Sequence, residues 1–155
     1  MVRTLTRLGG SLGTVAAALG MLAACGPAGT RSSTTEDAWK ALKPDDLGKV
    51  IYETRYGSGG MSSDPPTHEA VIATTGAPST VMADAATAIT DQGYELVGAA
   101  CTPGATCRFQ HEGDAGLVTV RLSLIPPHSS TEVRGQHVTV GDTGPALRLA
   151  VMNGG

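Results

Sequence analysis

The first 25 residues determine how much of this 155-residue chain is left to form a folded domain. Arg3 and Arg7 precede an uncharged run over residues 8–24 that is rich in Leu, Ala, Val and Gly, and Cys25 follows it directly. A basic start, a short apolar stretch and small residues before a cleavage point are the parts of a secretory signal peptide. A helix that spans a bilayer needs about 20 consecutive apolar residues, whereas glycines interrupt this shorter run. We therefore expect residues 1–24 to be a signal peptide.

The residues at the cleavage point, Leu22-Ala23-Ala24-Cys25, resemble the lipobox of bacterial lipoproteins. The resemblance is confined to this signal segment. It implies that the Cys25 thiol receives a diacylglycerol and that cleavage leaves Cys25 as the new N-terminus. Acyl chains such as palmitate would then anchor the protein to the cell membrane on its extracytoplasmic face, because two or three chains at about 0.8 kcal/mol per buried methylene give stable binding. The lipid bilayer is therefore an expected partner.

Two other outcomes for this segment stay open: a signal peptide that is cleaved without lipidation, and a helix that stays in the membrane. Arg outnumbers Lys, and Ala, Gly, Thr and Val are abundant, which resembles the small envelope lipoproteins of high-GC Gram-positive bacteria. In a host with one membrane the protein would lie on its outer face. In a host with two membranes, an outer-membrane location facing the periplasm is the alternative.

The chain after Cys25 divides into a tether and one domain. Residues 25–35 are rich in Gly, Pro, Ser and Thr and hold no large apolar side chain, so we expect a flexible tether. About ten such residues have an end-to-end distance on the order of 17 Å. Residues 36–155 are enough for one extracytoplasmic domain and too few for two.

The composition limits both the core and the partners of this domain. Aromatic residues make up only 3% of the chain, so Val, Leu, Ile and Ala must build the core. The formal net charge is −3 and lysine is scarce, so we expect an acidic, lysine-poor surface without a basic cluster. These features argue against binding of nucleic acid or of anionic lipid headgroups.

Cys101 and Cys107 are the two cysteines that remain once Cys25 is lipidated. An exported protein is in a disulfide-permissive setting, and Pro103-Gly104 between them suits the centre of a type II turn. We therefore predict a disulfide that joins two flanking strands. Redox pairs use Cys-x-x-Cys at a helix start, and a zinc site would need further ligands at suitable spacing, so both readings are less favoured.

The pattern of apolar residues predicts an α+β fold, with one main helix packed on a largely antiparallel sheet. The main helix is expected over residues 78–92, where Val81, Ala85, Ala88 and Ile89 form one stripe. A shorter helix is expected after a cap at Thr34 or Thr35, with Trp39 and Leu42 on one face and an end before Pro44.

The expected strands form a strand-helix-strand-strand-strand core with weaker strands added at the C-terminal end. They cover residues 49–56, 70–74, 94–99, 107–111 and 117–125, and then 138–140 and 146–152. The first strand is expected to place Val50, Tyr52, Thr54 and Tyr56 on one side and Glu53 and Arg55 on the other. Glycine, proline and serine predict a loop over residues 57–67, and Glu112 to Gly116 is expected to be a turn.

Catalytic and metal-binding patterns were sought and none is predicted. Ser58 lies in Gly-Ser-Gly-Gly, which is neither a nucleophile elbow nor a phosphate loop. Acidic pairs at residues 36–37 and 45–46 occur at helix-start or turn signals, where carboxylates serve as caps. The histidines do not have the spacing of metal ligands; they are His68, His111, His128 and His137.

Two classes of function remain. The favoured one is a non-enzymatic, membrane-anchored binding or envelope-interaction module without a cofactor, whose partner is an envelope protein, a peptide or a small ligand. Its expected contact surfaces are the open sheet face and the loop over residues 57–67. The alternative is an envelope enzyme, or an accessory subunit of an enzyme or transporter complex. A fixed array of His, Asp or Ser in one pocket would favour the enzyme.

Overall fold

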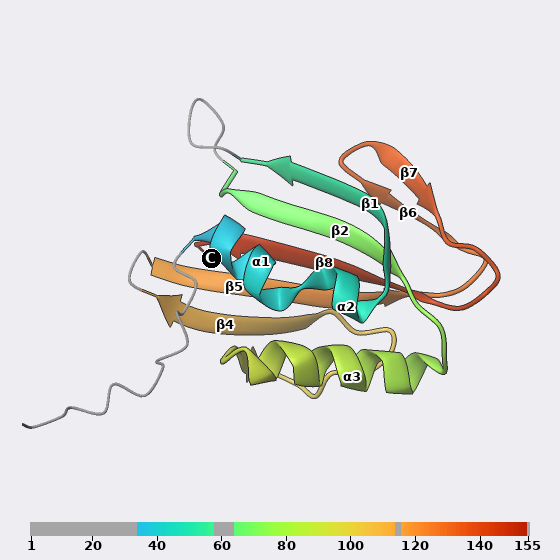
Figure 1. The fold of residues 1–155 in the computed structure, drawn as a ribbon, viewed down its shortest axis with the longest axis horizontal. Helices are drawn as coiled ribbons and strands as arrows, with labels where there is room; N and C mark the ends of the chain where they lie inside the picture. The colour runs from blue at the N-terminus through green and yellow to red at the C-terminus, as the bar shows by residue number, and fades with distance from the viewer. Residues whose placement is uncertain (1–33, 58–63, 114–115, 155) are drawn as a thin grey trace, which may run out of the picture.

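The computed structural model describes residues 34–57, 64–113 and 116–154. In order, the elements are α1 (Thr35–Leu42), α2 (Pro44–Leu47), β1 (Lys49–Tyr56), β2 (Thr67–Ala73), α3 (Pro78–Asp91), β3 (Glu95–Val97), β4 (Cys107–Gly113), β5 (Gly116–Ile125), β6 (Ser130–Val133), β7 (Gln136–Thr139) and β8 (Ala146–Asn153). Six strands form one antiparallel sheet in the order β1-β2-β8-β5-β4-β3 (Figure 1). β6 and β7 form a separate hairpin.

The largely antiparallel sheet confirms the coarse fold prediction, but the domain is dominated by strands and is not a balanced α+β fold. The predicted signal peptide, Cys25 and the tether up to residue 33 lie outside the described residues. In the part of the chain that is described, no helix is long and apolar enough to cross a membrane.

Both predicted helices are present, and local signals explain where they begin and end. The Thr34 side chain accepts a hydrogen bond from the backbone N–H of Asp37 at 3.2 Å, which caps α1. The last residue of the predicted tether, Thr35, is therefore the first residue of α1, and Thr34 is its N-cap. Trp39 and Leu42 are buried, as their shared face predicts. Pro44 then begins the short helix α2, which the sequence pattern did not predict.

α3 begins at Pro78, as predicted, and ends one residue earlier than expected. Its buried stripe consists of Val81, Met82, Ala85 and Ile89. Gly93 follows with φ of 87°, a left-handed conformation that glycine adopts without strain and that turns the chain out of the helix.

β1 confirms a predicted strand but corrects the assignment of its faces. Val50 pairs with Ile72 and Tyr52 pairs with Val71, so one extra residue lies in β1 between these two pairs. Such a bulge changes the face of every later side chain relative to strict alternation. Val50 consequently packs with the helices, whereas Tyr52 packs against the cluster on the opposite face.

The C-terminal strand is the largest departure from the predicted topology. β8 was expected only as a weaker strand added after the core, yet it lies between β2 and β5 and pairs with both along its length. Its burial explains this position, because Leu147, Leu149 and Val151 are buried against the helices while Ala146 and Ala150 are buried on the other side. A strand buried on both faces belongs in the interior of a sheet.

The remaining strands differ from prediction mainly in length. β2 begins at Thr67, three residues before the expected start, and so includes His68 and Glu69. β3 is shorter than predicted and exposed, β4 extends to Gly113, and β6 was not predicted. The strand that ends at Ile125 before Pro126 is confirmed. Most of the predicted loop over residues 57–67 and the centre of the turn at residues 114–115 lie outside the described residues.

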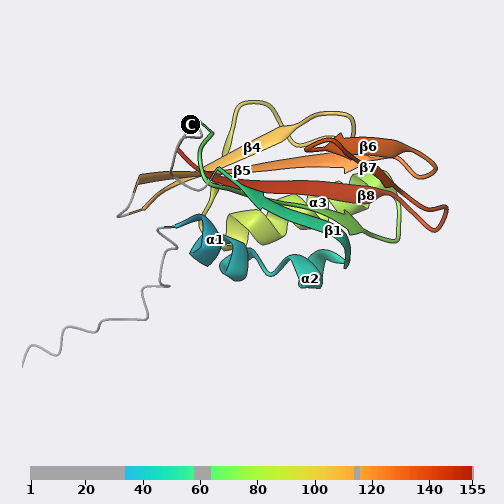
Figure 2. The same cartoon turned by 90° about the horizontal axis from the view of Figure 1, so that it is seen from above.

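The two faces of the sheet are covered differently. α1, α2 and α3 lie on one face over the larger apolar cluster, which includes Trp39, Ile72, Phe109 and Leu149. The β6–β7 hairpin lies on the opposite side, at one end only (Figure 2), and closes a smaller cluster around Val71 and Ile125. Arg134 and Gly135, both at positive φ, form its two-residue turn. Much of this second face is left to polar side chains.

Cys101 and Cys107 form the predicted disulfide, with their Cα atoms 5.4 Å apart. It joins the start of β4 to the loop that follows β3, in the place where the sequence predicted a covalent link between two strands. The sulfurs lie beside the larger apolar cluster.

Replacing both Cys101 and Cys107 by alanine should lower the free energy of unfolding by about 2 kcal/mol, because a short covalent loop no longer restricts the unfolded chain. Urea denaturation of the oxidised protein and of the double variant measures the difference. Reduced wild-type protein is the matched control and should behave like the double variant. Equal stability of the oxidised protein and the double variant would contradict a structural disulfide.

Candidate functional site

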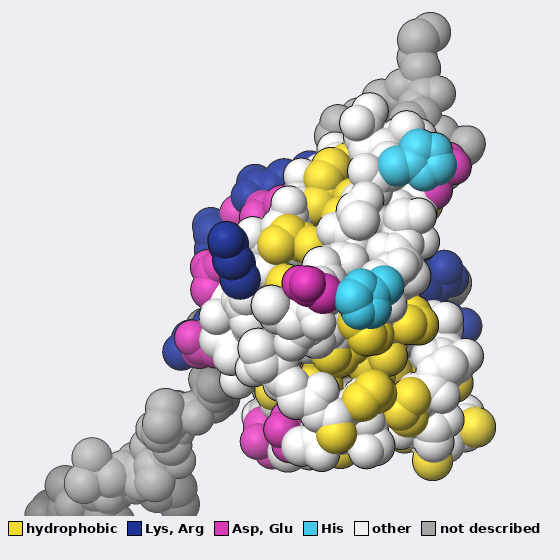
Figure 3. Space-filling view, turned by 90° about the vertical axis from the view of Figure 1, so that its right-hand side faces the viewer, with side chains coloured by type: hydrophobic (Ala, Val, Ile, Leu, Met, Phe, Trp, Pro, Cys, Tyr) yellow, Lys and Arg dark blue, Asp and Glu magenta, His cyan; other side chains and the backbone are white. Residues whose placement is uncertain are grey.

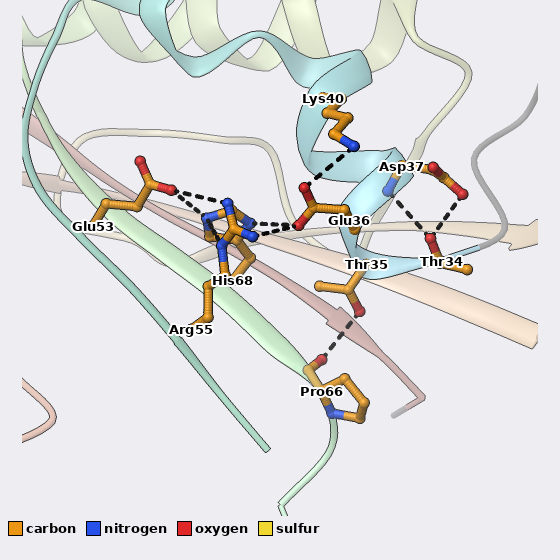
Figure 4. Close-up of polar contacts among 9 residues, drawn as sticks. All are labelled: Thr34, Thr35, Glu36, Asp37, Lys40, Glu53, Arg55, Pro66 and His68. Carbon is orange, nitrogen blue, oxygen red and sulfur yellow. Dashed lines mark hydrogen bonds and ion pairs between the residues drawn. The ribbon is translucent and has the colours of Figure 1, made fainter. Parts of the chain in front are cut away.

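His68 on β2 lies at the centre of a first cluster, which we call the histidine cluster and which comprises Glu36, Trp39, Glu53, Arg55 and His68. Figure 4 shows its polar members. Its side chain is only 1% exposed. The indole of Trp39 on α1 stacks on the imidazole, with ring centroids 3.8 Å apart and planes 21° apart. The contact attaches α1 to the sheet.

The carboxylate of Glu53 determines which imidazole nitrogen carries the proton. His68 Nε2 lies 2.6 Å from Glu53 Oε1 and 3.2 Å from Arg55 Nε. The Glu53 carboxylate is an acceptor and the closer of the two partners, whereas the Arg55 guanidinium can only donate. We therefore assign a proton to Nε2, which then donates to Glu53. In the neutral ring Nδ1 is then the acceptor. It is buried, has no hydrogen-bond partner among the described residues, and lies 3.8 Å from Glu36 Oε2.

The charged groups around His68 neutralise one another across two elements, α1 and β1. Glu36 on α1 pairs with Arg55 on β1 at 3.0 Å and with Lys40 at 3.4 Å, and Arg55 also lies 3.6 Å from Glu53. Figure 4 shows these side chains converging on the imidazole. The pairs are partly exposed, so each contributes at most about 1 kcal/mol. Their arrangement joins the first helix to the edge of the sheet.

A pocket of about 450 Å³ lies beside this cluster, with Thr35, Arg55, Thr67 and His68 in its wall. The hydroxyl of Thr35 donates to the Pro66 carbonyl at 3.2 Å, and that of Thr67 donates to the Pro65 carbonyl. Neither forms the hydrogen bond to His68 that an activated nucleophile needs. The histidine cluster is therefore best explained as a connection between α1 and the sheet.

Burial lowers the pKa of His68 from its ordinary value of 6.5, and the nearby Arg55 cation also lowers it. The hydrogen bond to Glu53 and the Glu53 and Glu36 charges oppose this change but do not outweigh burial. Since the unfolded chain binds the proton more readily, protonation of His68 favours unfolding.

Stability should therefore fall as the pH drops below about 6.5, by at most about 1.4 kcal/mol per pH unit from this one group. Urea unfolding between pH 7.5 and pH 5 measures the slope. His68→Phe keeps an aromatic ring against Trp39 and removes the titrating group, so its slope should be smaller over the same range. An identical slope in the two proteins would show that His68 does not control it.

A second polar surface lies on the face of the sheet opposite the helices, and we call it the arginine face, defined by Arg108, Arg121 and Arg148. Arg108 on β4 is directly opposite Arg121 on β5, and Arg148 on β8 is opposite Ser123, two residues further along β5. Residues opposite each other, or two apart, share a face. The alternate residues Leu122 and Leu149 pack with the helices, so these arginines project from the other side.

Glu69 on β2 is the buried acid at one border of the arginine face and is only 2% exposed. Its carboxylate accepts from Arg148 Nε at 2.5 Å and from the Tyr56 hydroxyl at 3.0 Å. Burial raises the pKa of Tyr56, and the Glu69 charge raises it further. Arg134 of the hairpin lies over the Tyr56 ring, 3.9 Å from its centroid. These contacts fix the direction of the Arg148 side chain.

Arg121 is exposed and, like Arg108, forms no ion pair with the described residues, whereas Arg148 is paired with Glu69. Arg108 donates to the Gln110 amide oxygen at 2.5 and 3.2 Å, with the amide oriented to suit those donors. A pocket of about 260 Å³ lies on this face; its wall includes Tyr56, Glu69, Thr106, Arg121, Ser123 and Arg148. We take this surface as the candidate functional site.

The sequence analysis named the open sheet face as an expected contact surface but missed the residues of this site, because the three arginines are far apart in the chain. The expectation that no basic cluster exists is therefore wrong for the folded protein, although it describes the linear sequence correctly. The only available signal was that Arg108, Arg121 and Arg148 each lie within an expected strand. Their common face depends on strand order and register, which the position of β8 decides.

The other predicted site residues are not brought together. His111 meets Tyr94 edge to face at 5.6 Å, and burial raises the pKa of Tyr94 to about 12. His128 and His137 are exposed, and Ser58 lies outside the described residues. Among the residues that are described, no group of three or more His, Cys, Asp and Glu side chains is placed to hold a metal ion.

A pocket of about 570 Å³ lies between α2 and α3 at the other end of the domain. Its wall includes the core residues Val81, Ala85 and Leu147 and the exposed acids Asp46 and Asp84. Figure 3 shows hydrophobic side chains gathered on the lower half of this end of the molecule. The pocket is the space left where two helices meet over the sheet.

Comparison of the whole chain with protein-family models, curated proteins and solved structures finds no match.

Proposed function

We propose that this protein is a lipid-anchored, extracytoplasmic binding domain that contacts an anionic ligand through the arginine face. The observation that carries the proposal is the pair Arg108 and Arg121, which lie directly opposite each other on neighbouring strands. Like charges in this position destabilise a sheet. A bound anion would remove that repulsion, so the pair is best explained by binding.

The position of α1 supports a role for the tether. α1 begins at Thr35 and is attached to the helix-covered side of the sheet by Trp39 and Glu36. Figure 2 shows α1 on one side of the sheet, and the arginine face is the other side, so the chain enters the domain at Thr34 on the side away from the arginines. An anchor at Cys25 and a ligand at Arg121 are therefore compatible.

The contacts of His68 support binding over catalysis. It is the only fully buried histidine in the described part of the chain. His68 is engaged by Glu53 and Trp39, and the hydroxyls beside it bond backbone carbonyls. On the arginine face, Glu69 is engaged by Arg148 and Tyr56. A catalytic group would need a free position toward a substrate.

Cys25→Ser should abolish lipid attachment and processing at that position, because a hydroxyl lacks the nucleophilicity of a thiol. Metabolic labelling with a fatty acid and mass spectrometry of the mature N-terminus test this result in the expressing host. Cys101→Ser is the matched control, since it makes the same substitution at a cysteine outside the signal segment and should leave labelling unchanged. If the Cys25→Ser protein still incorporates the labelled fatty acid, lipid anchoring at Cys25 is wrong.

A further inference from the structure

We infer that the arginine face binds a phosphoryl group, held mainly by two arginines. Arg121 lies in the wall of the pocket that Ser123 and Thr106 border, and Arg108 is directly opposite Arg121 on the neighbouring strand. The inference rests on the proposed binding function and adds the chemical class of the ligand. It applies to phosphate itself and to phosphate esters, including the headgroup of an anionic phospholipid.

The first argument is charge. Four side chains with full positive charge surround this part of the sheet: Arg108, Arg121, Arg134 and Arg148. Arg148 is paired with Glu69, and Arg134 is 3.3 Å from Asp64. Arg108 and Arg121 are left without a carboxylate partner among the described residues, in a chain whose formal net charge is −3. Two uncompensated guanidinium groups match a ligand that carries up to two negative charges.

The second argument is preorganisation. Glu69 accepts from both Arg148 and Tyr56, so its own charge is compensated and Arg148 is held at the border of the pocket. Gln110 accepts from Arg108 and restricts its guanidinium. Side chains whose positions are already fixed lose less entropy when a ligand binds. Arg121, which is exposed, can then complete the site.

The third argument is the kind of donor. The hydroxyls of Thr106 and Ser123 form no hydrogen bonds with the described residues, and both border the 260 Å³ pocket. The disulfide at Cys107 restricts the segment that carries Thr106. Guanidinium groups offer forked pairs of N–H donors, and hydroxyls add single donors. A tetrahedral oxyanion has three or four acceptor oxygens and can therefore accept from more of these guanidinium and hydroxyl donors than a carboxylate, which has two oxygens.

The test is titration of the full lipidated protein, in a non-ionic detergent, with inorganic phosphate and with acetate, followed by calorimetry. Phosphate should bind measurably more tightly than acetate. Arg121→Gln should weaken phosphate binding at least about tenfold, because it removes a charge-assisted contact. The melting temperature of this variant should stay the same or rise, since the repulsion with Arg108 is relieved. If Arg121 had only a structural role, its substitution would lower the melting temperature.

Lys49→Gln is the matched control, because it also removes one exposed positive charge, on the edge strand β1. Its phosphate affinity should equal that of the wild type. Equal weakening by the two variants would show a general charge effect and overturn the inference. Tight binding of acetate that depends on Arg121 would overturn the phosphoryl class and leave the proposed binding function standing. Failure of both anions to bind would reject the arginine face as an anion site.

Two phosphate esters distinguish the sources of the ligand. Glycerol 3-phosphate is a soluble monoester, whereas glycerophosphoglycerol is the deacylated form of an anionic phospholipid. Tighter binding of the monoester supports a soluble phosphate compound, and tighter binding of the diester supports a lipid headgroup. Both results uphold the inference if Arg121→Gln weakens the binding, and binding of either ester that is unchanged in Arg121→Gln contradicts it.

Discussion

Strand β8 pairs with β2 on one side and with β5 on the other, and this double pairing joins the two halves of the sheet. Leu147, Leu149 and Val151 face the helices and complete the larger apolar cluster. The residues between them face the other way, and among these Arg148 reaches Glu69 on the neighbouring strand. Without β8 in this position, neither the buried face nor the arginine face would exist.

The two faces of the sheet carry different kinds of side chain. The chain has few aromatic residues, and one of them, Trp39, packs on His68 where α1 contacts the helix-covered side of the sheet. On the other side the β6–β7 hairpin covers only the end near Val71 and Ile125. The arginines that remain there carry like charges on adjacent strands, a cost in stability that binding of an anion would offset. In the proposed function, the chain from the anchor enters the domain on one side of this small sheet and the ligand binds on the other.

The features that sequence reasoning predicted are those set by nearby residues. Thr34 and Pro44 bound the first helix, Pro78 and Gly93 bound the main one, and the short Pro103-Gly104 segment brings Cys101 to Cys107. Pairings between distant segments could not be read in the same way. Nothing local distinguishes the last strand as central, because its apolar run fits an edge or a central strand equally well until the neighbours are known.

Dependence on distant partners also explains which residues near the candidate site were assigned wrongly from the sequence. The extra residue near Ile51 reverses the face of Val50, and alternation alone cannot show such a bulge. His68 and Glu69 were left out of the second strand because their polar side chains made its beginning resemble a loop. Their burial depends on partners from distant elements, Trp39 for His68 and Arg148 for Glu69. The arginine face likewise needs the register of three strands.

Native-state hydrogen exchange tests most directly whether β8 joins the sheet. The amides of Leu149 and Val151 should exchange only through global unfolding, with the free energy that urea denaturation of the same protein gives. Amides of the exposed edge strand β3, such as that of Val97, should exchange through local opening at a lower free energy. If the β8 amides exchange as easily as those of β3, then β8 is not the central strand and the arginine face is not formed as described.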